Sequence, residues 1–250
     1  MKRFIMIVAA LLAMALLFGC AAKSDGPAAG ANVIKFGVFE PLTGANAAGG
    51  AEELDGIRLA QSLYPTVTVG GKEYKIELVI ADNKSDKVEA ANAGQRLVDS
   101  DKVTLVLGSW GSSLSMAAGP IFEAAKVPAI GLSCTNPLVT LGNPYYFRVC
   151  FLDPFQGTVM ANYAFKNVNA KNAVIIREVT NDYSVGLAKF FADSFKALTG
   201  NQSAILAELN YQTGDQDFSA QLTRVKSLNP DVIFAPGNYT ESALIIKQAR

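Results

Sequence analysis

Histidine is absent from this 250-residue sequence, tryptophan occurs once and cysteine three times. Without histidine, the chain lacks the side chain that most often acts as a general base or binds a metal ion. The cysteines, Cys20, Cys134 and Cys150, form no C-x-x-C pair, which excludes a zinc site of the usual spacing. We therefore expect no metal site and no cofactor.

Charged residues are also few, at 18% of the chain, and the 22 acidic and 22 basic residues cancel. No stretch is rich in lysine and arginine, so the sequence argues against nucleic acid as a partner. Hydrophobic residues make up 50% of the chain, enough for the cores of one large or two modest α/β domains.

The longest uninterrupted apolar run, Phe4–Phe18, is shorter than the about 20 residues that span a bilayer. It follows Lys2 and Arg3, an arrangement typical of a signal peptide. The run leads to Gly19-Cys20, and this ending resembles a bacterial lipobox, in which the cysteine is acylated and becomes the mature N-terminus.

We therefore expect a signal peptide over residues 1–19 and a flexible, small-residue tether over residues 20–31. Cys20 would carry the lipid that holds the protein outside the cytoplasm at a cell membrane. The alternative is an ordinary secretory signal followed by an incidental cysteine.

From Asn32 onward, strand-like and helix-like segments alternate, which predicts right-handed parallel crossovers and a doubly wound α/β fold. We expect a hairpin over Pro65–Ile80, and other strands over Asn32–Phe39, Val103–Leu107, Val127–Gly131, Tyr145–Phe151, Ala173–Val179, Ala204–Leu209 and Asp231–Ala235. We expect helices ending near Tyr64, Ser100 and Lys126, then over Phe155–Asn167, Asp182–Leu198 and Asp217–Leu228, and from Thr240 onward. The segments divide into an N-terminal lobe over residues 32–150 and a C-terminal lobe over residues 151–250.

The most informative stretch is Leu105–Thr135, a strand–helix–strand unit with glycine and hydroxyl residues after both strands. Ligands of open parallel sheets bind beyond the carboxyl ends of the strands, where the next helix also presents free N–H groups. The stretch therefore predicts a small anion cradle suited to a carboxylate. The alternative is that Ser112 or Ser113 only caps the helix.

The mature chain resembles the extracytoplasmic solute-binding proteins of branched-chain amino-acid (LIV-type) ABC transporters. The resemblance rests on the order and spacing of several short motifs. These are Pro41-Leu42-Thr43-Gly44, the Asp82 turn, Gly108-Ser109 with Ser112-Ser113, Thr135-Asn136-Pro137, Phe147-Arg148, Asp153-Pro154-Phe155-Gln156-Gly157, Tyr183 with Gly186-Leu187-Ala188, Asp217-Phe218-Ser219 and Gly237-Asn238-Tyr239.

The resemblance implies a two-lobed periplasmic-binding-protein type I fold with an amino acid in the cleft. Ser112 and Thr135 match the hydroxyls that bind the ligand carboxylate, and Ser133 matches the position whose carbonyl accepts the ligand ammonium. Tyr183 matches the aromatic residue that the second lobe lays over the ligand, although it also fits a half-buried core position. Hydroxyls and a helix N-terminus bind a carboxylate without placing a cation beside the ammonium.

Two residues and the length depart from the family pattern. Gly49 stands where leucine-binding members have an aromatic wall, and Asn238, with Tyr239 next to it, stands where they have another pocket tyrosine. Members are commonly longer. We therefore expect this chain to be a C-terminally truncated member with an incomplete second lobe. The missing part would include the acidic residue that pairs with the ligand ammonium.

The resemblance implies capture of a small amino acid, branched-chain or related, and delivery to the permease subunits of an ABC transporter. The alternatives are a ligand-sensing domain of a receptor and a fragment without function. An enzyme is disfavoured because no G-x-G-x-x-G follows the first strand and no base stands beside the hydroxyls.

Cys134 and Cys150 remain open to two interpretations. An exported protein permits a disulfide between them. Both also suit small apolar positions in a packed interior.

Overall fold

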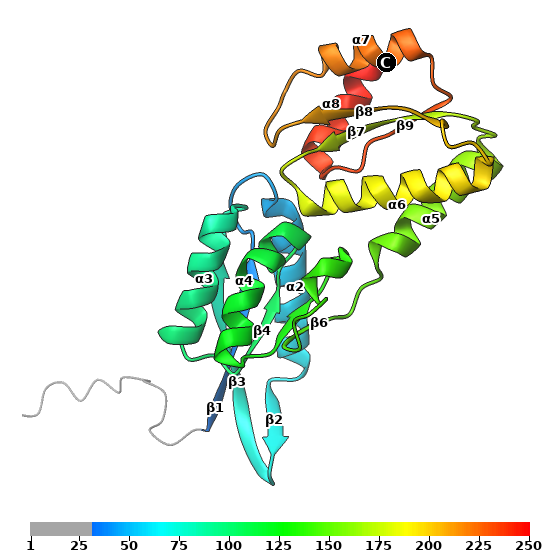
Figure 1. The fold of residues 1–250 in the computed structure, drawn as a ribbon. Coiled ribbons are helices and arrows are strands. Elements are labelled where there is room, and N and C mark those ends of the chain that lie inside the picture. The colour runs from blue at the N-terminus through cyan, green and yellow to red at the C-terminus, as the bar shows by residue number, and fades with distance from the viewer. Residues whose placement is uncertain (1–31) are drawn as a thin grey trace, which may run out of the picture. The chain divides into compact units, whose positions relative to one another are not determined.

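The computed structural model describes residues 32–250, and Val33–Arg250 pack as one compact unit (Figure 1). The predicted signal peptide, the tether and Cys20 lie outside the described residues. Among the residues that are described, no helix has both the length and the apolar character needed to cross a membrane.

The first of two sheets, here called the N-terminal sheet, has the strand order β2-β3-β1-β4-β5-β6. Its strands are β1 (Val33–Glu40), β2 (Thr66–Val69), β3 (Lys72–Asp82), β4 (Leu105–Gly108), β5 (Ala129–Gly131) and β6 (Tyr146–Arg148). All neighbours run parallel except the hairpin pair β2–β3. Gly70 and Gly71 form the hairpin turn with φ of 58° and 77°, so the predicted hairpin is confirmed.

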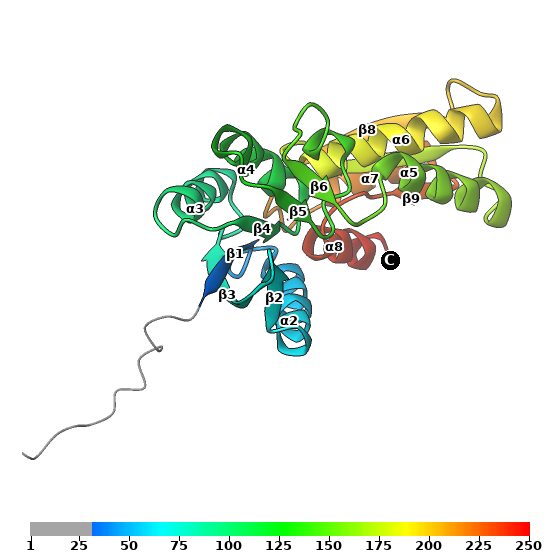
Figure 2. The same ribbon diagram turned by 90° about the horizontal axis from the view of Figure 1, so that it is seen from below.

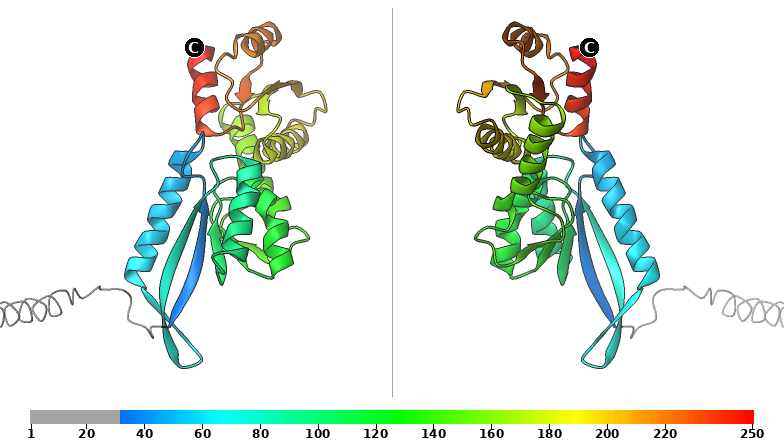
Figure 3. Two further views of the ribbon diagram at one scale, coloured as in Figure 1. Left: turned by 90° about the vertical axis from the view of Figure 1, so that its left-hand side faces the viewer. Right: turned by 90° about the vertical axis from the view of Figure 1, so that its right-hand side faces the viewer.

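Three helices cover this sheet: α2 (Ala47–Leu63) on one face, and α3 (Lys87–Asp99) with α4 (Ser112–Ala125) on the other (Figure 2). Successive residues of β1 point to opposite faces. Val38 packs with Leu54 and Ile57 of α2, whereas the ring of Phe39 lies 5.8 Å from that of Phe122 in α4. Figure 3 shows α2 running alongside β1.

The C-terminal sheet contains three parallel strands in the order β8-β7-β9. These are β7 (Ala173–Glu178), β8 (Ile205–Tyr211) and β9 (Val232–Phe234). The helices are α5 (Asp153–Asn162), continued by the π-helical turn η2 (Tyr163–Asn167), α6 (Asp182–Thr199), α7 (Ser219–Leu228) and α8 (Tyr239–Ala249). Ile175 of β7 packs toward α6, and Ile176 packs toward α8 on the opposite face.

The loop from β1 to α2 is held by the Asp82 turn. Asp82 Oδ1 accepts the N–H of Leu42 at 2.8 Å, and Oδ2 accepts the Thr43 hydroxyl at 2.7 Å. Burial raises the pKa of this carboxyl, but the hydrogen bonds lower it further, so its net pKa lies below the ordinary value. The turn thus fixes the start of α2.

The parallel α/β fold is confirmed, with local differences at the ends of several elements. The predicted strand Tyr145–Phe151 is shorter, because its only partner, β5, ends at Gly131 opposite Arg148. The 3₁₀ turn η1 (Pro137–Val139) was not predicted; the side chain of Asn136 stabilises it by accepting the Leu138 N–H at 2.9 Å. The lobe boundary at residue 150 stays a prediction.

Candidate functional site

A cleft of about 810 Å³ is lined by residues that follow the carboxyl ends of strands in both sheets. All six residues predicted to contact a ligand line this one cleft: Ser112, Ser133, Thr135, Tyr183, Asn238 and Tyr239. The structure thus brings together side chains that lie up to 127 positions apart, from 112 to 239. Their role as ligand contacts stays a prediction.

Neither Ser112 nor Ser113 caps α4, so the capping interpretation is wrong. The N-cap is Gly111, whose φ of 96° favours glycine, and no side chain bonds to the cap N–H groups. Ser112 Oγ instead accepts the N–H of Asn136 at 3.1 Å. Because the oxygen serves as an acceptor there, its proton is free to be donated into the cleft.

Thr135 lies on the loop after β5, and only 7% of its surface is exposed. Its hydroxyl oxygen is buried without a hydrogen bond of normal geometry, as are both carboxyl oxygens of the neighbouring Asp153. Burial raises the pKa of Asp153, although the Thr135 hydroxyl and the Arg148 guanidinium partly oppose this shift. The Thr135 hydroxyl therefore faces the Asp153 carboxyl at the edge of the cleft and forms no hydrogen bond of normal geometry there.

Arg148 fixes the conformation of this loop. Its Nη1 donates to the carbonyl oxygens of Cys134 at 2.7 Å and Asn136 at 2.9 Å, on both sides of Thr135. Its Nη2 donates to the Thr140 hydroxyl at 2.8 Å. The planar guanidinium can hold several acceptors at once, so Arg148 keeps Thr135 in place without entering the cleft lining.

Tyr183 stands in the first turn of α6, where the side chain of Asn181 caps the helix by accepting the Tyr183 N–H at 3.0 Å. The Tyr183 hydroxyl accepts a hydrogen bond from Gln156 Nε2 at 3.1 Å. Burial raises the pKa of Tyr183, which keeps the phenol neutral. Its ring therefore offers the cleft an apolar face whose orientation is set by Gln156.

The first turn of α6 is bonded to elements of the N-terminal sheet. The Asp182 N–H donates to Ser113 Oγ at 2.8 Å, and the Asp182 carbonyl accepts from Asn136 Nδ2 at 2.7 Å. The Asp182 carboxylate also pairs with Lys87 at 2.9 Å. These contacts set Tyr183 against the wall of the cleft that carries Ser112 and Thr135.

Asn238 and Tyr239 lie at the start of α8 and contact the segment before α2. Asn238 Nδ2 donates to Asn46 Oδ1 at 3.0 Å, and the Tyr239 hydroxyl donates to the Ala45 carbonyl at 2.9 Å. The backbone N–H of Ala48 donates to the same Tyr239 oxygen at 3.2 Å. These two residues therefore close the cleft on the side opposite α6.

The sequence interpretation missed Trp110, which lines the cleft directly before Gly111. A Cβ atom on Gly49 would lie 2.5 Å from the Trp110 ring, so the glycine leaves the space that the indole fills. The Trp110 ring lies 6.0 Å from that of Tyr239 at an angle of 59°. A lone tryptophan at the end of a central strand, paired with the departure at Gly49, was the available signal.

The charged residues of the cleft lining already have partners. Asp86 accepts the N–H groups at the start of α3, Lys87 pairs with Asp182, and Glu178 accepts from Asn181 Nδ2 at 3.0 Å. No free cation lines the cleft among the described residues, and no group of metal-ligating side chains occurs among them. An anion here would be bound by hydroxyl and N–H donors.

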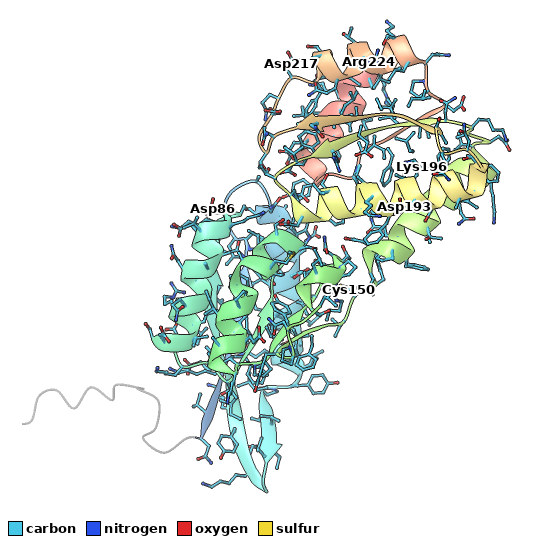
Figure 4. All side chains as sticks on the ribbon, in the orientation of Figure 1. Asp86, Cys150, Asp193, Lys196, Asp217 and Arg224 are labelled. Carbon is cyan, nitrogen blue, oxygen red and sulfur yellow. The ribbon has the colours of Figure 1, made fainter. Side chains whose placement is uncertain are left out.

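Cys134 and Cys150 are free thiols in the structure. Cys150, labelled in Figure 4 on the segment after β6, lines the cleft, whereas Cys134 is buried. A hydrogen bond from the Cys134 thiol lowers the pKa of Cys150 to about 7, and the same bond together with burial raises the pKa of Cys134.

Comparison with known proteins finds relatives whose names all describe amino-acid or substrate binding. An amino acid binding protein of Pseudomonas aeruginosa is 31% identical over 219 residues, which cover 87% of this chain and 57% of the relative. A leucine binding protein of Thermotoga maritima is 44% identical, with a TM-score of 0.81 over 87% of this chain and 60% of that one. The substrate binding protein of a branched-chain amino acid transporter from Streptococcus pneumoniae, solved with isoleucine, is 36% identical, with a TM-score of 0.77 over 88% and 61% of the two chains.

The chain thus spans between 57% and 61% of the length of these relatives. Its residues 33–250 match the sequence profile described as periplasmic binding protein. That family consists of extracytoplasmic solute-binding proteins and not of enzymes. The profile match and the relatives together show that this chain belongs to the periplasmic binding protein family, in the group associated with LIV-type branched-chain amino-acid ABC transporters.

Proposed function

We propose that this protein binds a small amino acid, branched-chain or related, in the cleft and delivers it to the permease subunits of an ABC transporter. The observation that carries the proposal is the pair of available hydroxyls at Ser112 and Thr135. Ser112 begins α4, where free N–H groups add to the cradle, and Thr135 Oγ1 is buried without a hydrogen bond of normal geometry. Such a set binds a carboxylate, and no cation beside it repels an ammonium group.

The rest of the cleft suits an apolar side chain. Trp110, Leu114, Phe151 and Tyr183 line it and offer aromatic or aliphatic surface. We assign the Ser133 carbonyl to the ligand ammonium and the Tyr183 ring to a position over the bound ligand. The solved relatives named for leucine and crystallised with isoleucine support a branched-chain ligand.

The lone tryptophan provides the test, since Trp110 lines the cleft and its fluorescence reports on binding there. We expect leucine, isoleucine or valine to change the emission of the chain in a saturable way. The corresponding amines, which lack the carboxylate, would not. If calorimetry and fluorescence both show no response to any amino acid in a broad panel, this function is wrong.

In the same assay we expect Tyr183→Ala to weaken binding, because it removes contact area over the ligand. Tyr163→Ala is the matched control, since Tyr163 is 58% exposed on η2 and does not line the cleft. Equal affinities for the two variants would contradict the assignment of Tyr183.

We also propose that Cys20 is acylated and tethers the protein to the outer face of a cell membrane. The apolar run Phe4–Phe18 and the Gly19-Cys20 ending support this. Metabolic labelling with a fatty acid should mark the parent and the control Cys150→Ser, but not Cys20→Ser. Label retained by Cys20→Ser would show that the lipid is attached elsewhere.

A further inference from the structure

Two carboxyl groups, that of the buried Glu40 and that of the half-buried Glu53, take no part in the proposed ligand contacts. Glu40 ends β1 and is 0% exposed, and Glu53 lies in α2. Glu40 Oε2 accepts the backbone N–H of Trp110 at 2.7 Å, and Glu53 Oε1 accepts the Ser133 hydroxyl. Each carboxyl thus holds one residue of the cleft lining.

The remaining oxygen of each carboxyl, Glu40 Oε1 and Glu53 Oε2, is buried without a hydrogen-bond donor. The two side chains lie within hydrogen-bonding reach of each other. No ion pair of either carboxyl occurs among the described residues. Two adjacent ionised carboxylates in such a place would repel each other, with one hydrogen-bond donor each and no cation among the described residues to compensate them.

The other titratable groups that face the pair are the Tyr146 hydroxyl and the Cys150 thiol. The Tyr146 hydroxyl donates to the Gly108 carbonyl at 2.8 Å, so its proton is not available to Glu40. Arg148, a cation on the edge strand β6, is occupied by the carbonyls of the Thr135 loop. A proton shared by the pair would supply the donor that the two orphan oxygens lack.

We propose that Glu40 and Glu53 share one proton and act as a positioning pair. The pair fixes the positions of Trp110 and of the loop that carries Ser133, both of which line the cleft. One proton between Glu40 Oε1 and Glu53 Oε2 gives both orphan oxygens a hydrogen bond and leaves the pair with a single charge. That charge is stabilised by the Trp110 N–H and the Ser133 hydroxyl. The pair thereby links α2, β1 and the loops after β4 and β5 at one point.

The electrostatics of the pair agree with this arrangement. Burial, and then the neighbouring Glu53 carboxyl, raise the pKa of Glu40 well above its ordinary value. Burial also raises the pKa of Glu53, although its hydrogen bond with Ser133 opposes the shift. The folded protein therefore binds more protons than the unfolded chain just above the ordinary glutamate pKa, so stability falls as the pH rises through this range.

The consequence for ligand binding rests on the proposed function. When the pair loses its proton, repulsion between the carboxylates separates α2 from β1 and loosens both Ser133 and Trp110. We expect the affinity for an amino acid to fall about tenfold over the pH range in which the proton is lost, as expected when a positioned hydrogen bond is lost.

Carboxyl carbon NMR of the chain, titrated with acid and base, tests the shared proton directly. The critical variant is Glu53→Gln, whose amide nitrogen can donate to Glu40 Oε1 at every pH while its oxygen accepts from Ser133. Glu52→Gln is the matched control, because Glu52 is the exposed neighbour on α2. The parent and the control should show a glutamate carboxyl with a raised pKa and a Tm that falls as the pH rises.

In Glu53→Gln the rise of the glutamate pKa and the fall of Tm with pH should both become smaller, because burial of Glu40 remains but the Glu53 carboxyl is gone. Glu40→Gln provides a second variant if this one fails to fold. Ordinary pKa values for every glutamate of the parent, or a pH–stability profile unchanged in both variants, would overturn the shared proton. Fluorescence titration with leucine at several pH values then tests positioning, and only the parent and Glu52→Gln should lose affinity with pH. If the affinity of the parent for leucine does not change with pH, the positioning role is overturned. If the parent binds no amino acid but still shows a glutamate carboxyl with a raised pKa, only the proposed function is overturned.

Discussion

Replacement of Ser112 or Thr135 by alanine should weaken amino-acid binding by roughly tenfold to a hundredfold. A hydrogen bond to a charged group contributes about 1.5–3 kcal/mol, which corresponds to this range of dissociation constants. The Ser112 oxygen already accepts the Asn136 N–H, so its proton is available to the ligand. The Thr135 hydroxyl is buried with no partner of normal geometry, so a ligand carboxylate would satisfy it.

Thr135→Val separates the hydroxyl from the shape of the side chain, because valine keeps the branched form without the donor. Binding is measured by Trp110 fluorescence and calorimetry, and the Tm of each variant reports on the fold. Thr158→Ala is a suitable control, since Thr158 is exposed on α5, does not line the cleft, and bonds to the Pro154 carbonyl and to Ser194 of α6. If Ser112→Ala and Thr135→Val both bind like the parent with intact folds, the carboxylate site lies elsewhere.

Phe191→Ala should lower the free energy of unfolding by about 3–5 kcal/mol, the range seen when a buried aromatic ring is deleted. Phe191 is 1% exposed in α6, and its ring stacks on Phe195 at 5.5 Å and on Phe234 of β9 at 4.0 Å. The truncation leaves a cavity between the helix and the sheet, which close-packed neighbours fill only in part.

Urea unfolding of the parent and the variant measures this difference. The matched control is Phe155→Ala, because Phe155 is 63% exposed on α5 and touches the ring of Phe151 only at the surface, at 6.2 Å. We expect the control to change stability by less than about 1 kcal/mol. Equal losses in the two variants would show that the α6 core does not depend on this ring.

Local sequence pattern was sufficient for most of the fold. Alternating apolar residues predicted β1, an apolar run predicted β7, glycines marked the hairpin turn, and helical spacing predicted α6. These signals are local, because each is a property of a strand, a turn or one helix face. The boundary of β6 was missed because the end of a strand depends on its partner, and β5 stops at Gly131.

The same contrast holds at the site. The small-residue loops after β4 and β5 predicted where Ser112, Ser133 and Thr135 would meet, since parallel strands end at one edge of the sheet. The sequence did not predict that Ser112 would accept from Asn136 instead of capping α4, or that Trp110 would fill the space beside Gly49.

The sequence alone therefore determined the α/β class, the order of the elements and the edge of the sheet at which the candidate site lies. Only the tertiary structure decided which donors remain free there and how Glu40 and Glu53 come to face each other without a cation. The physical reason is that hydrogen-bond satisfaction and burial depend on neighbours distant in sequence, whereas strand and helix patterns depend on adjacent residues.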